Sequence, residues 1–149
     1  MTQDPAAELD TVAHCACGKV TVTVKGRPLS MLLCACVDCQ KATGTGHAAV
    51  LLMRAADVAI SGETRGHARP ADSGAMTTRH FCPECGTPLF GRSSRAEGVL
   101  LLPAGLFGAA AAGLRPSQLI FARSHRDWDV VDTALPRWQT YRDKEAPDE

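Results

Sequence analysis

The sequence predicts an all-β fold in one domain, and three observations support this prediction. Short stretches in which apolar and polar residues alternate recur along the chain, turn-forming residues separate them, and helical periodicity is scarce. With 149 residues, the chain is long enough for one hydrophobic core and short for two domains. We therefore expect a single, mainly β domain.

The strands are predicted from period-two alternation and from the turn residues that end each stretch. Residues 19–25, Lys-Val-Thr-Val-Thr-Val-Lys, form the clearest strand, and Gly26-Arg27-Pro28 predicts the turn that follows it. Further strands are predicted at 47–53, 77–81, 89–91, 99–102 and 118–123.

Helices are expected to contribute little. Residues 39–43 could form one helical turn, whereas 108–113 are predicted to be a loop because the stretch is short and has glycine at both ends. The polar chain ends predict solvated tails at 1–11 and 143–149, which leaves 12–142 as the folded domain.

The charge distribution argues against two classes of partner. Lys plus Arg (16) balance Asp plus Glu (16), and no long block carries one sign, so non-specific binding to nucleic acid or to an anionic membrane is not expected. The first ten residues lack the pattern of a secretory signal, and the longest apolar-leaning runs are far shorter than the roughly 20 residues that cross a bilayer. We expect a soluble, cytoplasmic protein.

Seven cysteines give the chain its most specific chemical signal. In a reducing compartment they favour metal binding over disulfides, and an odd number would leave one thiol over if all the others were paired. A division into one set of four and one set of three accounts for all seven.

The central set is Cys34, Cys36 and Cys39. In an extended segment, residues two apart project to the same side, and the gap before Cys39 suits a turn that brings a third sulfur back. Three thiolates can hold zinc and leave its fourth position open to water, a thiol or a carbonyl oxygen. The alternatives are a structural metal completed by a histidine, and a redox pair of Cys36 and Cys39.

The outer set consists of Cys15 and Cys17, just before the clearest strand, and Cys82 and Cys85. The spacing of the second pair is typical of a zinc knuckle, in which Gly86 adopts positive φ and backbone amides point at the sulfurs. Together the pairs would form a structural four-cysteine site that closes a long loop. The alternatives are redox dithiols or buried free thiols.

The order of these motifs resembles a known family. The motifs are Cys-x-Cys-Gly, then Cys-x-Cys-x-x-Cys, then Phe-Cys-x-x-Cys-Gly, and the likeness covers about residues 15–138. It also includes the stretches 17–20, 34–44, 79–87, 104–106, 124–128 and 135–138. The chain resembles the glutathione-dependent formaldehyde-activating enzyme family, which also includes a vertebrate centromere protein.

The resemblance implies a zinc-stapled, β-tent-like domain of twisted antiparallel sheets with two zinc ions. Its structural zinc would be held by Cys15, Cys17, Cys82 and Cys85, and its reactive zinc by the catalytic cysteines Cys34, Cys36 and Cys39. This agrees with the division into four and three.

The implied activity is that of a carbon–sulfur lyase: reversible addition of the thiol of glutathione, or of a similar small molecule, to formaldehyde or a related aldehyde. The product with glutathione would be S-hydroxymethylglutathione. Three thiolates plus zinc carry a formal charge of minus one, so we expect positioning of the substrate thiol to matter more than polarisation of the aldehyde. The rival hypothesis is a non-catalytic zinc module that binds a protein partner.

Three places depart from the family pattern, one of which is Leu106-Phe107-Gly108, where members often carry an acidic turn after the leucine. Val37 and Gln40 stand where members often have a serine and a basic residue, so two polar or charged contacts to a tripeptide are missing. Outside the cysteines, His47 is the preferred candidate for the edge of the three-cysteine site, as a ligand or an acid–base group. Lys41, Arg79 and Arg123 could offset thiolate charge or bind a carboxylate, although such residues usually lie on a solvated face.

Overall fold

The computed structural model describes residues 7–141, whose strands form two sheets. The three-stranded sheet has the antiparallel order β1 (Leu9–His14), β2 (Thr21–Gly26), β5 (Val58–Ser61). The seven-stranded sheet has the order β10 (Leu119–Ile120), β3 (Ser30–Cys34), β4 (Ala48–Arg54), β9 (Val99–Pro103), β8 (Pro88–Ser93), β7 (Met76–Phe81), β6 (Arg65–Pro70). Its neighbouring strands are antiparallel except β10 and β3, which are parallel.

The helices of the described residues are short. They are the α-helix α1 (Val37–Thr43) and the 3-10 helices η1 (Ala55–Asp57), η2 (Ala104–Ala111) and η3 (Ala122–Ser124). Among residues 7–141, no helix has the length and apolar character needed to cross a membrane.

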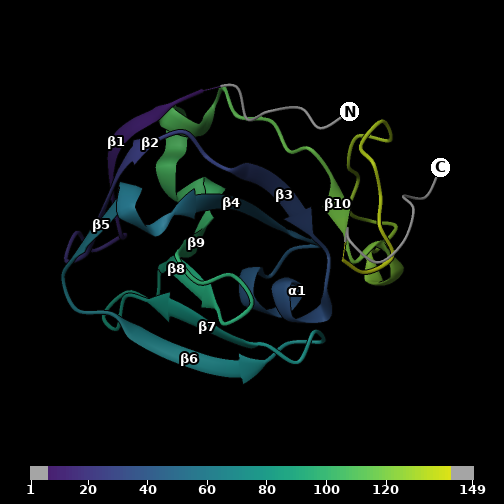
Figure 1. Cartoon of the computed structure of the whole chain (residues 1–149), viewed down its shortest axis with the longest axis horizontal. Coiled ribbons are helices and arrows are strands. Elements are labelled where there is room, and N and C mark those ends of the chain that lie inside the picture. Colours follow the sequence, from purple (N-terminus) through teal and green to yellow (C-terminus); the bar gives the residue numbers. More distant parts are fainter. Residues whose placement is uncertain (1–6, 142–149) are drawn as a thin grey trace.

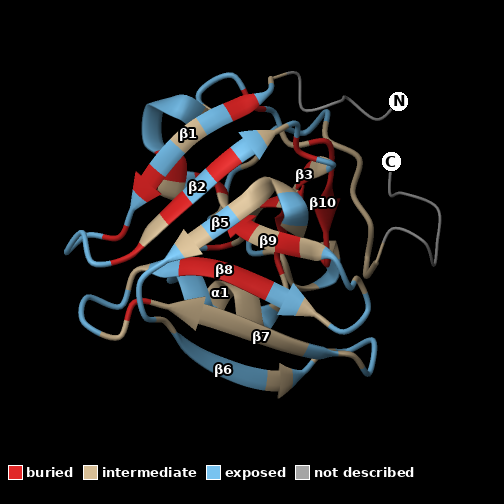
Figure 2. Cartoon of the chain, turned by 60° about the vertical axis from the view of Figure 1, so that its left-hand side comes forward, coloured by how far each residue is buried: buried red, intermediate tan, exposed pale blue. Residues whose placement is uncertain are grey.

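Strand alternation decides which side chains enter the main core. In β2, Val22 and Val24 are buried while Thr23 between them is exposed. Leu51 and Met53 of β4 are likewise fully buried, and side chains of both sheets belong to one apolar cluster. Figure 2 shows the buried stretches of β2 and β8. Each fully buried aliphatic side chain contributes about 1.5–3 kcal/mol, so this cluster holds the two sheets together.

The seven-stranded sheet is strongly curved, and α1 lies inside the curve (Figure 1). One end of the curve is formed by β10 and β3, and the other by β7 and β6. An ion pair between Asp38 of α1 and Arg69 of β6 joins the helix to the far end of the sheet. A pocket lined by residues of α1 and of the sheet lies inside this curve.

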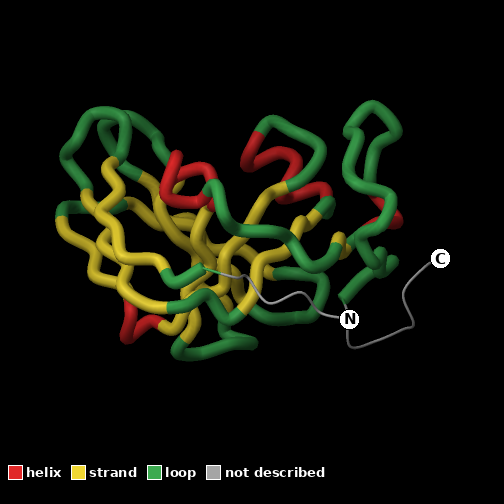
Figure 3. Tube along the Cα trace, turned by 90° about the horizontal axis from the view of Figure 1, so that it is seen from above, coloured by secondary structure: helices red, strands yellow, loops and turns green. Residues whose placement is uncertain are grey.

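The segment after β10 consists mostly of loops and forms a lobe at one end of the molecule (Figure 3). It returns beside β10, since the amide of Trp138 donates to the carbonyl of Leu119 at 3.0 Å and the amide of Leu119 donates to the carbonyl of Pro136 at 2.9 Å. The amide of Ala35 donates to the carbonyl of Ile120 at 3.0 Å, so β10 supports the chain at the central cysteine cluster.

The mainly β prediction is confirmed, and the predicted strands correspond to β2, β4, β7, β8, β9 and β10. The prediction at 118–123 was too long, because β10 ends at Ile120 and η3 follows. The predicted loop at 108–113 was partly wrong, because the 3-10 helix η2 continues to Ala111 with a kink at Gly108.

The predicted N-terminal tail was wrong for residues 9–11, because these belong to β1 and pair with β2. Residues 1–6 and 142–149, which hold most of both predicted tails, lie outside the described residues. The division of the chain into one domain and two tails otherwise stays a prediction.

Candidate metal centres and the adjoining pocket

Two turns bring four cysteines together at one edge of the molecule. Cys15 and Cys17 follow β1, and Cys82 and Cys85 follow β7, so the cluster joins the two sheets. The Sγ of Cys17 lies 3.6 Å from that of Cys15 and 3.7 Å from that of Cys82. All four sulfurs lie within 4.8 Å of one another.

Each of the two turns contains a glycine in the left-handed conformation. Gly18 and Gly86 adopt φ values of 79° and 77°, and each donates its amide to the carbonyl of the cysteine three or four residues earlier, Cys15 at 3.0 Å and Cys82 at 2.8 Å. This left-handed conformation is readily accessible only to glycine. In the first pair, the amide of Val20 points at the Sγ of Cys15 from 3.3 Å.

Thr87 supports the exposed half of this cluster. Its hydroxyl oxygen lies 3.2 Å from the Sγ of Cys85 and accepts the amide of Ala16 at 3.1 Å. The contact with Thr87 is the largest influence that lowers the pKa of Cys85, to about 5. The hydroxyl therefore favours the thiolate form that a metal requires.

The central three cysteines lie where β3 gives way to α1. Cys34 ends β3, Cys36 is the extended N-cap residue of α1, and Cys39 lies in the first helical turn. The Cys36 sulfur accepts the amide of Cys39 at 3.2 Å, as an N-cap side chain does. The predicted extended segment followed by a turn is therefore present, and the turn is the start of a helix.

Side chains around α1 fix this arrangement. The amide group of Gln40 donates to the carbonyls of Ala35 and Ser124, both at 2.9 Å, and the Ser124 hydroxyl donates to the same carbonyl of Ala35 at 2.9 Å. Gln40 thus ties the helix to the lobe after β10. Gln40, which stands where family members often have a basic residue, therefore has a structural role in this chain.

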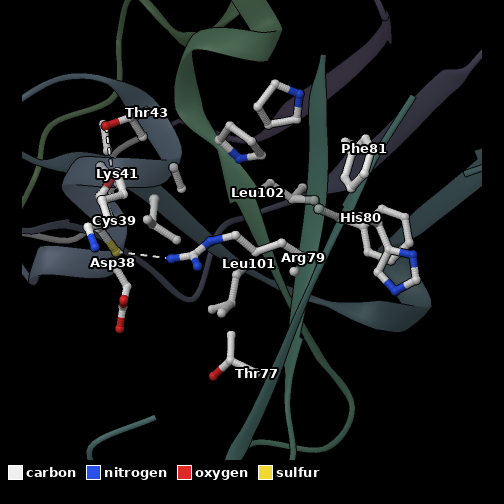
Figure 4. Close-up of a pocket in the computed structure, with 18 of the residues that line it drawn as sticks. Asp38, Cys39, Lys41, Thr43, Thr77, Arg79, His80, Phe81, Leu101 and Leu102 are labelled. Atoms are coloured by element: carbon white, nitrogen blue, oxygen red, sulfur yellow. Dashed lines mark hydrogen bonds between the residues drawn. The ribbon is translucent and has the colours of Figure 1, made fainter. Parts of the chain in front are cut away.

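A fixed positive charge faces the cluster. Arg79 extends from β7 across the pocket, and its Nη2 donates to the Sγ of Cys39 at 3.5 Å (Figure 4). The hydrogen bond from Cys34 contributes most to lowering the pKa of Cys36, and Arg79 adds to the effect. The pKa of Cys34 is raised by its hydrogen bonds to Cys36 and Cys39 and by burial. In the absence of metal, the thiolate charge of this cluster is therefore held mainly by Cys36.

Both sets fit zinc. Sulfurs about 2.3 Å from a tetrahedral ion are separated by about 3.8 Å, close to the 3.6 and 3.7 Å of the four-cysteine cluster. The three central sulfurs also lie within 4.8 Å of one another. They offer three donors rather than four, the number found in zinc sites with an open position.

A pocket of about 770 Å³ lies between α1 and the curved sheet, and Cys39 is part of its wall. Leu101 and Leu102 of β9 and Phe90 of β8 supply apolar surface, and Lys41, Arg69 and Arg79 supply positive charge. Figure 4 shows Cys39, Asp38 and Lys41 of α1 opposite Arg79 and Thr77 of β7. The pocket thus combines one cysteine of the central cluster with a cationic, partly apolar wall.

A family model described as glutathione-dependent formaldehyde-activating enzyme matches residues 10–124, which include all seven cysteines. The chain belongs to this family. Membership associates it with glutathione-dependent formaldehyde activation, and glutathione and formaldehyde are the substrates that the family name implies.

The fold is also that of a solved structure. The crystal structure of a Rhodobacter sphaeroides protein, a structural genomics target, superposes with a TM-score of 0.53 at 14% sequence identity. The match covers 86% of this family member and 99% of the Rhodobacter chain. At this identity, the likeness concerns the fold alone.

The structure brings together the predicted cysteines of each set and separates the two sets. His47 and His80 both line the pocket, and His80 also contacts Thr64 at 3.2 Å and stacks on Phe90. Of the three predicted cationic residues, Lys41 and Arg79 line the pocket, while Arg123 is paired with Asp72 at 2.8 Å.

One group near the site was not predicted from the sequence. The structure places His125 and Asp129 against His47, and these three side chains form a further cluster. The His125-Arg126-Asp127-Trp128 stretch was noted for its family resemblance, but nothing in the sequence indicates that it folds against the start of β4.

Proposed function

We propose that this family member is a zinc-dependent carbon–sulfur lyase that reversibly adds glutathione, or a similar anionic thiol, to formaldehyde or a related aldehyde. The observation that carries the proposal is the position of Cys39 in the wall of the cationic pocket, beside Cys34 and Cys36. In this proposal these three cysteines hold the reactive zinc, and the four outer cysteines hold the structural one. A reducing compartment such as the cytoplasm would keep all seven thiols available.

The pocket supports an anionic substrate. Asp38, the acidic residue that lines it within the described part of the chain, is paired with Arg69, so Lys41 and Arg79 leave an excess of positive charge. Carboxylates of a tripeptide thiol are matched by such groups, and arginine can bind a carboxylate through two donors. The apolar wall excludes water and strengthens these interactions.

Zinc at Cys34, Cys36 and Cys39 would supply a positive charge that favours the thiolate form of the substrate. The remaining contributions come from the chain itself. The guanidinium of Arg79 reaches Cys39 with one Nη and has further N–H donors for the substrate or for the oxygen that gains charge during addition. The pocket holds thiol and aldehyde together, so that their encounter becomes effectively intramolecular.

Two variants test the assignment of one reactive and one structural zinc site. We expect about two zinc ions per chain by elemental analysis, and faster exchange of ¹³C-formaldehyde with its glutathione adduct than in buffer alone, measured by NMR. Cys36→Ser should remain folded, lose one zinc and lose the acceleration, whereas Cys85→Ser should destabilise the fold.

The hypothesis of a non-catalytic zinc module predicts a different zinc content and a different exchange rate. If the purified protein contains one zinc and leaves the exchange rate unchanged, the rival hypothesis of a zinc domain that binds a protein partner replaces the enzyme proposal. Equal destabilisation by Cys36→Ser and Cys85→Ser would contradict the assignment of one reactive and one structural site.

A further inference from the structure

Two histidines meet one carboxylate oxygen next to the pocket. The Nδ1 of His47, the residue before β4, lies 2.6 Å from Oδ2 of Asp129, and the Nε2 of His125 lies 2.9 Å from the same oxygen. The three side chains are only 23%, 12% and 14% exposed, in the order His47, His125, Asp129. Solvent therefore weakens these contacts much less than it would weaken surface pairs.

The hydrogen-bond partners of His125 and His47 indicate which ring nitrogen of each carries the proton. A guanidinium Nη1 of Arg137 lies 3.5 Å from Nδ1 of His125, and arginine can only donate, so this nitrogen is the acceptor. The proton of neutral His125 is then on Nε2 and is donated to Asp129. Because Oδ2 of Asp129 has no proton to offer a second ring, His47 must also donate, from Nδ1.

This arrangement differs from a metal site. A metal would need the lone pairs of both rings, whereas the hydrogen bonds inferred above use an N–H group of each ring. Ligands about 2.1 Å from an ion and at right angles would be separated by about 3 Å, which is longer than the 2.6 Å between His47 and Asp129. The distance is typical of a charge-assisted hydrogen bond.

Asp129 is placed for this contact by a close approach of two segments. A Cβ at Gly46 would overlap the side chain of Asp129, so a larger residue at position 46 would displace the carboxylate. Burial tends to raise the pKa of Asp129, but hydrogen bonds from His47 and His125 outweigh it and keep the pKa below its usual value. The carboxylate therefore stays ionised and orients His47.

The second ring nitrogen of His47, Nε2, is not used in the contact with Asp129. His47 lines the same pocket as Cys39 and Arg79, and within the described residues its Nε2 has no hydrogen-bond partner. With the proton on Nδ1, this nitrogen carries a lone pair. It is a basic atom in a site where a thiol is to lose a proton and an aldehyde oxygen is to gain one.

We propose that His47, oriented by Asp129, is the proton-transfer residue of this pocket. This inference rests on the proposed function. As the carbon–sulfur bond forms, Nε2 of His47 accepts the thiol proton and then delivers it to the former carbonyl oxygen, which becomes the hydroxyl of the adduct. In reverse, Nε2 removes the hydroxyl proton, the carbonyl re-forms, and the electron pair of the carbon–sulfur bond leaves with sulfur, which recovers the proton.

The tautomer can be measured without any turnover. In ¹⁵N-histidine-labelled protein, we expect the neutral form of His47 to carry its proton on Nδ1. Asp129→Asn should shift His47 toward the other tautomer or a mixture, whereas Asp132→Asn, a change in the same segment, should leave the spectrum unchanged. A proton on Nε2 of His47 in the unaltered protein would overturn the proposal.

The rate provides the second test. His47→Gln should keep its zinc content and fold yet slow adduct exchange about 100-fold, since a general acid–base group typically contributes at least that much. His14→Gln is the control, because His14 is exposed on β1 and does not line the pocket. Asp129→Asn should lower kcat more than it raises KM, because Asp129 positions the base and does not touch the substrate.

The two ways of failing are distinguishable. If the unaltered protein accelerates exchange and His47→Gln does so equally well, the role of His47 is overturned while the proposed function stands. If the unaltered protein does not accelerate exchange, the proposed function itself is overturned, and the role of His47 in that reaction is overturned with it.

Discussion

At the scale of single residues, the central cysteines share one negative charge unequally. Cys36 has a lowered pKa because of hydrogen bonds from Cys34 and Cys39 and the charge of Arg79. The influences on the pKa of Cys39 oppose one another. The hydrogen bond from Cys34 lowers this pKa, but the hydrogen bond from Cys36 and burial together outweigh it and raise the pKa to about 11. At neutral pH without metal, Cys36 is therefore a thiolate, while Cys34 and Cys39 keep their protons.

This pattern predicts the proton stoichiometry of metal binding. Three thiolates must form, and one exists already, so zinc binding to this cluster should release about two protons near pH 7. Affinity should then rise about 100-fold for each unit of pH increase in this range, and fall on acidification. Calorimetry in buffers of different ionisation enthalpy, on protein that retains zinc at the four-cysteine cluster, measures the number.

The contrary result is equally specific. Release of no protons would mean that all three thiolates form without metal, which would contradict the hydrogen-bonded sharing of charge among Cys34, Cys36 and Cys39.

At the scale of elements, α1 depends on its two ends. Cys36 caps the first turn through its sulfur, and Gly44 ends the helix in the left-handed conformation, with φ 74° and its amide donating to the carbonyl of Gln40 at 2.8 Å. A helix of seven residues has little stability of its own, so both ends matter.

Gly44→Ala should therefore destabilise the protein by about 1–2 kcal/mol, the cost of this conformation for a residue with a side chain. Space is not the reason, since no atom lies within 4 Å of the added Cβ. Gly105→Ala is the matched control, because that position is also open and has no positive φ. Denaturant unfolding of the two variants gives the difference, and equal stability would show that the C-cap does not limit α1.

Which elements the sequence reveals depends on what buries them. β2 is covered on one face, so its alternation is visible. β3 has buried and partly buried residues on both faces, and the edge strand β6 is mostly exposed, so neither shows a period of two. Leu9–Thr11 were predicted to belong to a tail because the stretch is short and polar. Their pairing with β2 is a tertiary contact that such a local sequence does not predict.

The candidate site shows the same limit. Both cysteine sets could be predicted, since short spacings within each motif bring their sulfurs near one another and the motifs follow a family order. The contact of Arg79 with Cys39 spans 40 residues, and that of His47 with Asp129 spans 82. Such contacts depend on how the sheet curves around α1 and on where the lobe after β10 folds back, which no local pattern records.

At the scale of the whole molecule, the two cysteine clusters join different parts of the fold. The four-cysteine cluster connects the turn after β1, in the three-stranded sheet, with the turn after β7, in the seven-stranded sheet. Cys17 and Cys82 are 65 residues apart, so zinc there would close a long loop. The three central cysteines span the junction of β3 and α1 and close no long loop.

Removal of zinc in two steps should reveal this difference. A mild chelator should first extract the ion held by three ligands, with little change in the β-sheet circular dichroism and with loss of adduct exchange. Extraction of the second ion should coincide with loss of the sheet signal, because the binding energy of a structural zinc is part of the folding energy. A sheet signal that persists with neither zinc bound would show that the apolar core alone holds the two sheets, and would contradict a structural role for the four-cysteine cluster.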